Sequence, residues 1–180
     1  MATKKQIDFV KQVYPAAKRL YTEKPNESIH PIFETAQSAL EKGWIYDGKF
    51  NMFGITKGSS WKGPVDLLLT TEYFKNPDVK FAYPERIVGT PEKLANGNYK
   101  YRVYRYFRKY NSLDECLYDH QALFRKSGYA DAWPYRNEPL ECAKRLVDDT
   151  GWKYATGPEY YKAMASIIKT VQKIVEQEGL

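Results

Sequence analysis

One stretch constrains the fold of this chain more than any other: a run of helical apolar spacing that stops at a glycine. Its apolar residues recur three and four positions apart, as on one helix face, and they are Ile29, Ile32, Phe33, Ala36, Ala39 and Leu40. Ser28 is suited to cap the start, Pro31 falls in the first turn, and Gly43 is a good C-terminal stop. The pattern predicts a helix from Ser28 to Lys42 that buries one apolar stripe.

Glu41 lies in the last turn of this helix, well off the centre of the stripe. The C-terminal end of a helix carries partial negative charge, which disfavours a carboxylate and raises its pKa. If the nearby rings of Trp44 and Phe53 also exclude water, Glu41 stays protonated near neutral pH and is suited to donate a proton. The competing interpretation is an ordinary solvated glutamate on a helix surface.

Composition bounds the class of protein. The chain has 180 residues, of which 43% are hydrophobic, so one globular domain over residues 1–180 is expected. The net charge of +6 suits an anionic polymer, either a bacterial cell wall or a nucleic acid. The basic residues are scattered, which weakens the nucleic-acid interpretation. Aromatic residues make up 16%, and such rings pack on sugar rings as well as in cores.

No apolar run approaches the roughly 20 residues that span a membrane, so no membrane insertion is expected. The start, Met1 to Asp8, has two lysines but no apolar stretch behind them, and therefore does not resemble a signal peptide. We expect a protein made in the cytoplasm that reaches its target after lysis or by non-classical export, unless a leader is absent from this sequence.

The two cysteines, Cys116 and Cys142, have no metal-ligand spacing, and His30 and His120 complete no zinc motif with them. Both lie beside apolar residues in predicted helices. Buried reduced thiols are the favoured interpretation, and a disulfide is the alternative. No metal and no cofactor are expected.

Periodicity and turn signals divide the rest of the chain. Further helices are predicted over residues 5–22, 112–126, 138–150 and 158–176, and strands over 65–74 and 99–107. The two strands should pair antiparallel. Residues 75–98 between them are typical of a loop, with short strand fragments at 79–83 and 86–88. The prediction is an α+β, mostly α domain with one small antiparallel sheet inserted after the second helix.

In the first strand, strict alternation places Glu72 on the same face as Asp66 and Thr70. This is the more polar of the two faces. Glu72 is therefore expected to point away from the packed side of the sheet.

Several segments, in order, carry a resemblance to a known family. They are Phe9-Val10 with Tyr14-Pro15-Ala16-Ala17, Ala36 to Trp44, Asn51 to Ile55, Trp61 to Gly63, Thr70 to Tyr73, Tyr101 to Tyr104, and Gly151 to Thr156 with Tyr160. Together they resemble the N-acetylglucosaminidase family of bacterial cell-wall hydrolases, glycoside hydrolase family 73, which includes autolysins, phage lysins and the flagellar rod-assembly hydrolase. The match spans roughly Phe9 to Ile168.

The resemblance implies a lysozyme-like fold, with a helical body, a β lobe over about residues 62–108 and a cleft between them. It implies that Glu41 is the general acid and Glu72 the second carboxylate. Further residues are implied to bind the substrate: Trp44, Asn51, Phe53, Trp61, Tyr104, Tyr154 and Tyr160. Two departures from the family pattern stand out: residues 75–98 are longer than its usual hairpin, and Gly157 replaces a usual aspartate.

The expected activity is cleavage of peptidoglycan glycan strands after N-acetylglucosamine by a monomer. Carboxylates about 5–5.5 Å apart would indicate a retaining nucleophile, and about 6.5–9.5 Å an inverting water. The sugar's own N-acetyl group as nucleophile is a further option. The alternatives are a muramidase or lytic transglycosylase on the same fold, a cell-wall glycan-binding module without catalysis, and a nucleic-acid binder with steeply salt-dependent affinity.

Overall fold

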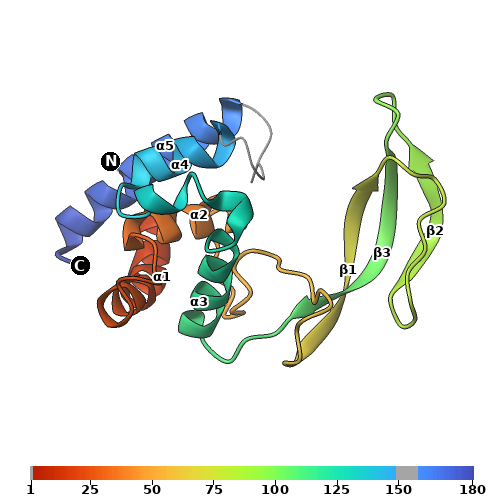
Figure 1. Ribbon diagram of the computed structural model, residues 1–180, viewed down its shortest axis with the longest axis horizontal. Helices are drawn as coiled ribbons and strands as arrows, with labels where there is room; N and C mark the ends of the chain where they lie inside the picture. Colours follow the sequence, from red (N-terminus) through yellow and green to blue (C-terminus); the bar gives the residue numbers. More distant parts are fainter. Residues whose placement is uncertain (1, 149–157) are drawn as a thin grey trace. The chain divides into compact units, whose positions relative to one another are not determined.

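The computed structural model describes residues 2–148 and 158–180, and the chain divides into two compact units. Met1–Phe53 and Asn111–Leu180 form a helical unit, and Gly54–Tyr110 forms a β unit. The helices are α1 (Lys4–Glu23), α2 (Pro31–Lys42), α3 (Leu113–Phe124), α4 (Pro139–Asp148) and α5 (Pro158–Glu178), and the strands are β1 (Val65–Phe74), β2 (Arg86–Lys93) and β3 (Tyr99–Arg108) (Figure 1). The predicted α+β, mostly α class with one small antiparallel sheet is confirmed.

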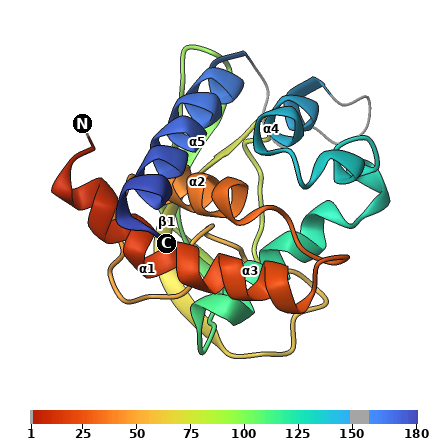
Figure 2. The same cartoon turned by 90° about the vertical axis from the view of Figure 1, so that its left-hand side faces the viewer.

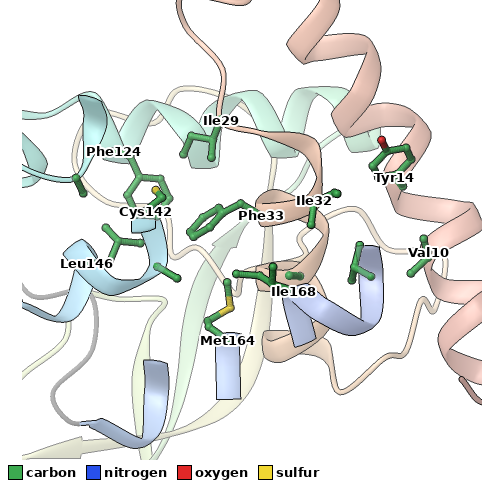
Figure 3. Close-up of a cluster of buried hydrophobic side chains, with 14 of the residues drawn as sticks. Val10, Tyr14, Ile29, Ile32, Phe33, Phe124, Cys142, Leu146, Met164 and Ile168 are labelled. Atoms are coloured by element: carbon green, nitrogen blue, oxygen red, sulfur yellow. The ribbon is translucent and has the colours of Figure 1, made fainter. Parts of the chain in front are cut away.

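Helix α2 is the centre of the helical unit. It packs against α1, α4 and α5, and Figure 2 shows it lying between α1 and α5. Its residues 31 to 39 are all buried, so the helix is covered on every side and not along one stripe as predicted. Phe33 lies in the middle of the core, facing Phe124 of α3, Leu146 of α4 and Met164 of α5 (Figure 3).

The start of α2 differs from the prediction. The helix begins at Pro31, and His30 is its N-cap, with a side-chain nitrogen that accepts a hydrogen bond from the Ile32 N–H at 3.3 Å. Ser28, the predicted cap, is buried, and its hydroxyl donates to the Leu20 carbonyl at the end of α1. Burial lowers the pKa of His30, which favours the neutral ring that an accepting nitrogen requires.

A buried polar pair ties α2 to α3. Glu34 and His120 are both fully buried, and Glu34 Oε1 lies 2.8 Å from His120 Nδ1. The His120 ring also stacks on Phe53 at a centroid distance of 3.4 Å and meets the edge of Phe124. One imidazole therefore links the central helix, helix α3 and the segment that leads out of the helical unit.

The β unit is a three-stranded antiparallel sheet in the order β1-β3-β2, with β3 in the middle (Figure 1). The predicted antiparallel pairing of β1 with β3 is confirmed, with Glu72 opposite Tyr101. Beyond the start of β2, residues 55–57 continue that edge of β3 through a bridge between Thr56 and Phe107.

The segment between β1 and β3 is more regular than predicted. Only short fragments were expected in residues 75–98, but β2 runs from Arg86 to Lys93 and Val79–Tyr83 is not a strand. β2 is an edge strand with an irregularity between Val88 and Glu92, and such a strand accommodates Pro91 because one side of it needs no hydrogen-bonding partner.

The face that carries Glu72 is the packed face of the sheet, which corrects the prediction. Residues opposite one another in an antiparallel pair share a face, so Glu72 lies with Tyr101, and Thr70 lies with Val103. Tyr101 and Val103 are fully buried. The polar character of β1 alone was misleading because its partner β3 supplies the apolar side chains of this face.

Candidate active site

Glu41 stands where α2 leaves the core. Burial continues through Ala39, decreases at Leu40 and ends at Glu41, which is exposed one residue before the helix stops. Gly43 ends the helix in the left-handed conformation with φ 56°, and its N–H bonds to the Ala39 carbonyl. The buried turns therefore hold the Glu41 backbone in place while its side chain lies at the surface.

One turn earlier, Gln37 points to the same side of α2, because residues four apart share a helix face. Gln37 is fully buried, and its side-chain nitrogen donates to the Tyr160 hydroxyl of α5 at 3.3 Å. Tyr160 therefore lies at the face of α2 that also carries Glu41, one turn further along the helix. Gln37 was part of the recognised motif, but sequence reasoning gave it no role.

Trp44 follows Gly43 and is also left-handed, with φ 62°. This conformation is uncommon for a residue with a large side chain. The indole packs edge-to-face on Phe9 at 5.8 Å and lies against the core. It also lines an open pocket of about 510 Å³ with Lys4 and Tyr46. Its role in substrate binding stays a prediction.

The segment that contains Asn51 and Phe53 is anchored on α3. Met52, between them, is buried, and its N–H bonds to Cys116 Sγ of α3 at 3.5 Å. Phe53 stacks on His120, and Asn51 is half-buried. Trp44 and Phe53 thus both pack on rings of the helical unit, while Glu41 is exposed.

Glu72 is half-buried on β1, between Thr70 and Phe74 of the same face. Phe74 meets the edge of the Tyr101 ring at 5.4 Å, and the Tyr101 hydroxyl donates to the Pro77 carbonyl at 2.6 Å. Across residues 2–148 and 158–180, the Glu72 carboxylate forms no side-chain hydrogen bond or ion pair. Glu72 therefore shares its face with two rings that contact each other, Phe74 and Tyr101.

Tyr104 lies on the opposite face of the same sheet. It pairs with Leu69, not with the Glu72 side of β1, and Arg86 stacks over its ring at 4.3 Å. The structure therefore does not bring Tyr104 and Glu72 together on one face. Trp61 lies outside the strands, and its indole N–H donates to the Pro64 carbonyl at 2.9 Å.

Tyr154, the remaining predicted site residue, falls outside the described residues. Within those residues, no three His, Cys, Asp or Glu side chains gather in a way that could hold a metal ion. Cys116 and Cys142 are free and buried, as predicted, and burial raises the pKa of each thiol to about 12. No helix in the described ranges is long and apolar enough to cross a membrane.

Sequence reasoning also missed the buried pair Glu34 and His120. A signal was present: Glu34 is a charged residue between Phe33 and Ala36 of the apolar stripe. A buried carboxyl group needs a partner. With His120 as one of two histidines in the chain, the pairing was open to inference once α2 was known to be buried all round.

A buried helix that ends in an exposed glutamate, together with a small antiparallel sheet, is the architecture of lysozyme-like glycoside hydrolase domains. Solved structures support this class. The C-terminally truncated glycoside hydrolase domain of Salmonella typhimurium FlgJ is 28% identical, with a TM-score of 0.64 over 93% of this chain and 98% of that one. A peptidoglycan hydrolase mutant from Sphingomonas sp. A1 is 25% identical, with a TM-score of 0.64 over 95% of this chain and 99% of that one.

The family model for glucosaminidase, described as mannosyl-glycoprotein endo-β-N-acetylglucosaminidase, matches residues 17–173. The peptidoglycan hydrolase FlgJ of Salmonella typhimurium is 30% identical over 168 residues, which are 88% of this chain and 44% of that protein. FlgJ of Escherichia coli K12 is 29% identical over 151 residues, 79% of this chain and 40% of that protein. The chain belongs to the glucosaminidase family, glycoside hydrolase family 73, and spans less than half the length of these curated relatives.

Proposed function

We propose that this chain cleaves the glycan strand of peptidoglycan after N-acetylglucosamine, with Glu41 as the general acid. The observation that carries the proposal is the position of Glu41, which is exposed at the end of a helix whose residues 31 to 39 are all buried. The names of the relatives, peptidoglycan hydrolases, support the choice of substrate.

Each carboxylate has a distinct task in this proposal. Glu41 protonates the glycosidic oxygen of the leaving sugar. Glu72 either activates the attacking water or offsets the positive charge that develops on the sugar ring. Tyr160, held by Gln37 near the Glu41 turn of α2, would bind the substrate beside the acid. Both carboxylates come from one chain, so a monomer suffices, and the site of action would be the cell wall.

The test is substitution of Glu41 by Gln, with release of reducing ends from purified peptidoglycan as the readout. Glu41→Gln should keep the melting temperature and lower the rate at least ~10²-fold, the usual scale for removal of a general acid. Glu23→Gln is the matched control, because Glu23 is also an exposed glutamate in the last turn of a helix. Near-normal lysis by Glu41→Gln would defeat the assignment.

The products separate the alternatives. A glucosaminidase leaves a reducing N-acetylglucosamine end, a muramidase leaves a reducing muramic acid end, and a lytic transglycosylase leaves an anhydro end. A glycan-binding module would release none. For Glu72→Gln we expect a loss of activity smaller than or comparable to that of Glu41→Gln, with Glu92→Gln on the same sheet as the control. A negligible loss would favour the sugar's own N-acetyl group as the nucleophile.

A further inference from the structure

The β unit carries a pocket of about 550 Å³ that the proposed reaction does not use. Three segments line it: residues 57–65, which lead into β1, the turn at 82–85 that precedes β2, and the end of β3.

The pocket is held together by one carboxylate. Between the start of β2 at Arg86 and the bridge at Thr56, the edge of β3 lacks a strand partner, and Glu85 fills the gap. Its Oε1 accepts from the Tyr106 backbone N–H at 2.7 Å and from Arg105 Nε at 3.0 Å. Both side chains of the Arg105–Glu85 pair are about four-fifths buried, at 22% and 20% exposure. The turn at 82–85 is therefore fixed to β3 by a charge-assisted contact.

Aromatic rings form part of the lining. The Trp61 indole is held by its bond to Pro64 and lies so close to Gly63 that a Cβ there would be 2.5 Å from a ring atom. Any larger residue at Gly63 would displace the ring. Tyr83 stands at the pocket with 90% of its surface exposed. An exposed tyrosine beside an oriented indole is suited to pack on the apolar face of a sugar ring.

The remaining charge of the pocket is positive. The lining contains three cationic side chains, Lys57, Lys62 and Arg105, and one carboxylate, that of Glu85. Arg105 already neutralises Glu85. Lys57 lies 5.4 Å from the centroid of the Tyr106 ring, and neither lysine forms an ion pair within the described residues. Two lysines that line the same pocket as Trp61, Tyr83 and Tyr106 favour a ligand that is both a ring and an anion.

We propose that this pocket binds a carboxylated sugar, the muramic acid unit of the glycan strand, through the carboxylate of its lactyl or peptide substituent. The proposal rests on the proposed function for its choice of sugar. In it, Tyr83 and Trp61 contact the pyranose ring, while Lys57 and Lys62 bind the carboxylate. A neutral N-acetylglucosamine unit would make the ring contacts but not the ionic ones.

The test is direct binding, measured by isothermal titration with three probes: N-acetylmuramic acid, muramyl dipeptide and neutral chitotriose. The full chain should bind the acidic probes more tightly than chitotriose, and the preference should shrink with salt. The relative affinity of the two acidic probes tells whether the lactyl or the peptide carboxylate is recognised. The Lys57→Ala/Lys62→Ala double variant should weaken the acidic probes at least ~10-fold and leave chitotriose nearly unchanged.

Matched variants separate the ring contacts from the ionic ones. Tyr83→Ala should weaken all probes by about 3- to 10-fold, the scale of one aromatic contact, whereas Tyr73→Ala, another exposed tyrosine of the β unit, should not. Lys80→Ala is the control for general charge, because Lys80 is exposed in the same unit outside the pocket. Equal affinity for acidic and neutral probes, or an unchanged double-lysine variant, would overturn the proposal.

Binding and cleavage fail independently in this design. Loss of the lysine effect, with wild-type release of reducing ends intact, would refute the pocket alone. Lysine-dependent binding of muramic acid by a chain that releases no reducing ends would refute the proposed hydrolysis and leave the pocket standing.

Discussion

The two units use their apolar side chains in opposite ways. The helical unit gathers them around α2, where Phe33, Met164 and Ile168 are fully buried. Among the described residues of the β unit, only three hydrophobic side chains are buried: Tyr101, Val103 and Tyr110. The same unit instead exposes large apolar side chains, namely Leu68, Leu69, Tyr73, Tyr83 and Val88.

This difference gives the two units different tasks: the helical unit positions Glu41, and the β unit offers side chains for contact with a ligand. In the helical unit, packing fixes the helix that carries Glu41, and few large apolar groups remain at the surface. In the β unit, the backbone pairing of β1 with β3 supplies the framework, and the side chains are left for the surface. Two of these exposed side chains, Leu69 and Tyr73, share one face of β1, and exposed apolar groups on one face are typical of surfaces that meet a ligand or partner. Substitutions should therefore affect stability in one unit and binding in the other.

The sharpest test of the comparison is truncation of one large apolar side chain in each unit. Phe33→Ala should cost about 3–5 kcal/mol of unfolding free energy, because it leaves a cavity beneath a helix covered on all sides. Leu69→Ala, at 40% exposure on β1, should cost about 0.5 kcal/mol or less. Urea denaturation followed by circular dichroism measures both. Similar losses of unfolding free energy would mean that Leu69 is packed as tightly in the β unit as Phe33 is in the helical unit.

The buried pair of the helical unit gives the next largest effect. Glu34→Ala should cost about 3 kcal/mol, because His120 loses the partner of its Nδ1 inside the core. The double variant Glu34→Leu/His120→Phe should recover much of that loss, since it replaces both groups with apolar ones and keeps a ring against Phe53. If urea denaturation gave the double variant an unfolding free energy no higher than that of Glu34→Ala, the pair itself would stabilise the fold.

Alkaline pH should weaken the helical unit, which contains both cysteines. Burial raises the pKa of Cys142 from 9.0 to about 12. Below pH 9 both the folded and the unfolded thiol are protonated, and stability is unaffected. Above it the unfolded thiol ionises while the folded one does not, so stability should fall by about 1.4 kcal/mol per pH unit for each such thiol. In urea titrations from pH 8 to pH 11, Cys142→Ala should show a shallower slope than the wild type.

The smallest effect should arise at the glycines with positive φ. Gly43 at the end of α2 has φ 56°, and a Cβ added there would meet no atom within 4 Å; Gly89 in β2 has φ 72° with equally open space. Alanine at either position should therefore cost about 1 kcal/mol through the backbone alone. Thermal melts would measure both. A much larger cost at Gly43 would show that the geometry of Trp44 depends on it.

Much of the fold could be predicted from local patterns. β1 was predicted with its observed limits because Val65 to Phe74 is rich in strand-forming residues and lies between Pro64 and the turn residues that follow Phe74. The predicted start of a helix at residue 112 also has a local cause, because a serine three residues before a glutamate offers its oxygen to the helix N–H groups. The Ser112 hydroxyl accepts from the Glu115 N–H at 3.1 Å. Gly43 was recognised as the stop of α2 because glycine adopts positive φ without a steric penalty.

The predictions were wrong where the local structure depends on a second element that is distant in the sequence. Ser28 and His30 are both able to cap a helix, and the contact of Ser28 with the end of α1 left the role to His30. The packed face of β1 depends on Tyr101 and Val103 of β3, which no pattern within β1 reports. The length of β2 was underestimated because its sequence alternates only weakly, and hydrogen bonds to β3 compensate for this.

Local order along the chain was thus enough to place Glu41 at the last turn of a helix and Glu72 within a strand, because spacing and capping act over a few residues. Long-range packing was needed for the rest: that α2 is enclosed on every side, that Gln37 reaches Tyr160, that Glu34 meets His120, and that Glu85 closes a pocket on β3. These contacts join residues that are distant in the chain, and their free energy exists only when both partners are brought together.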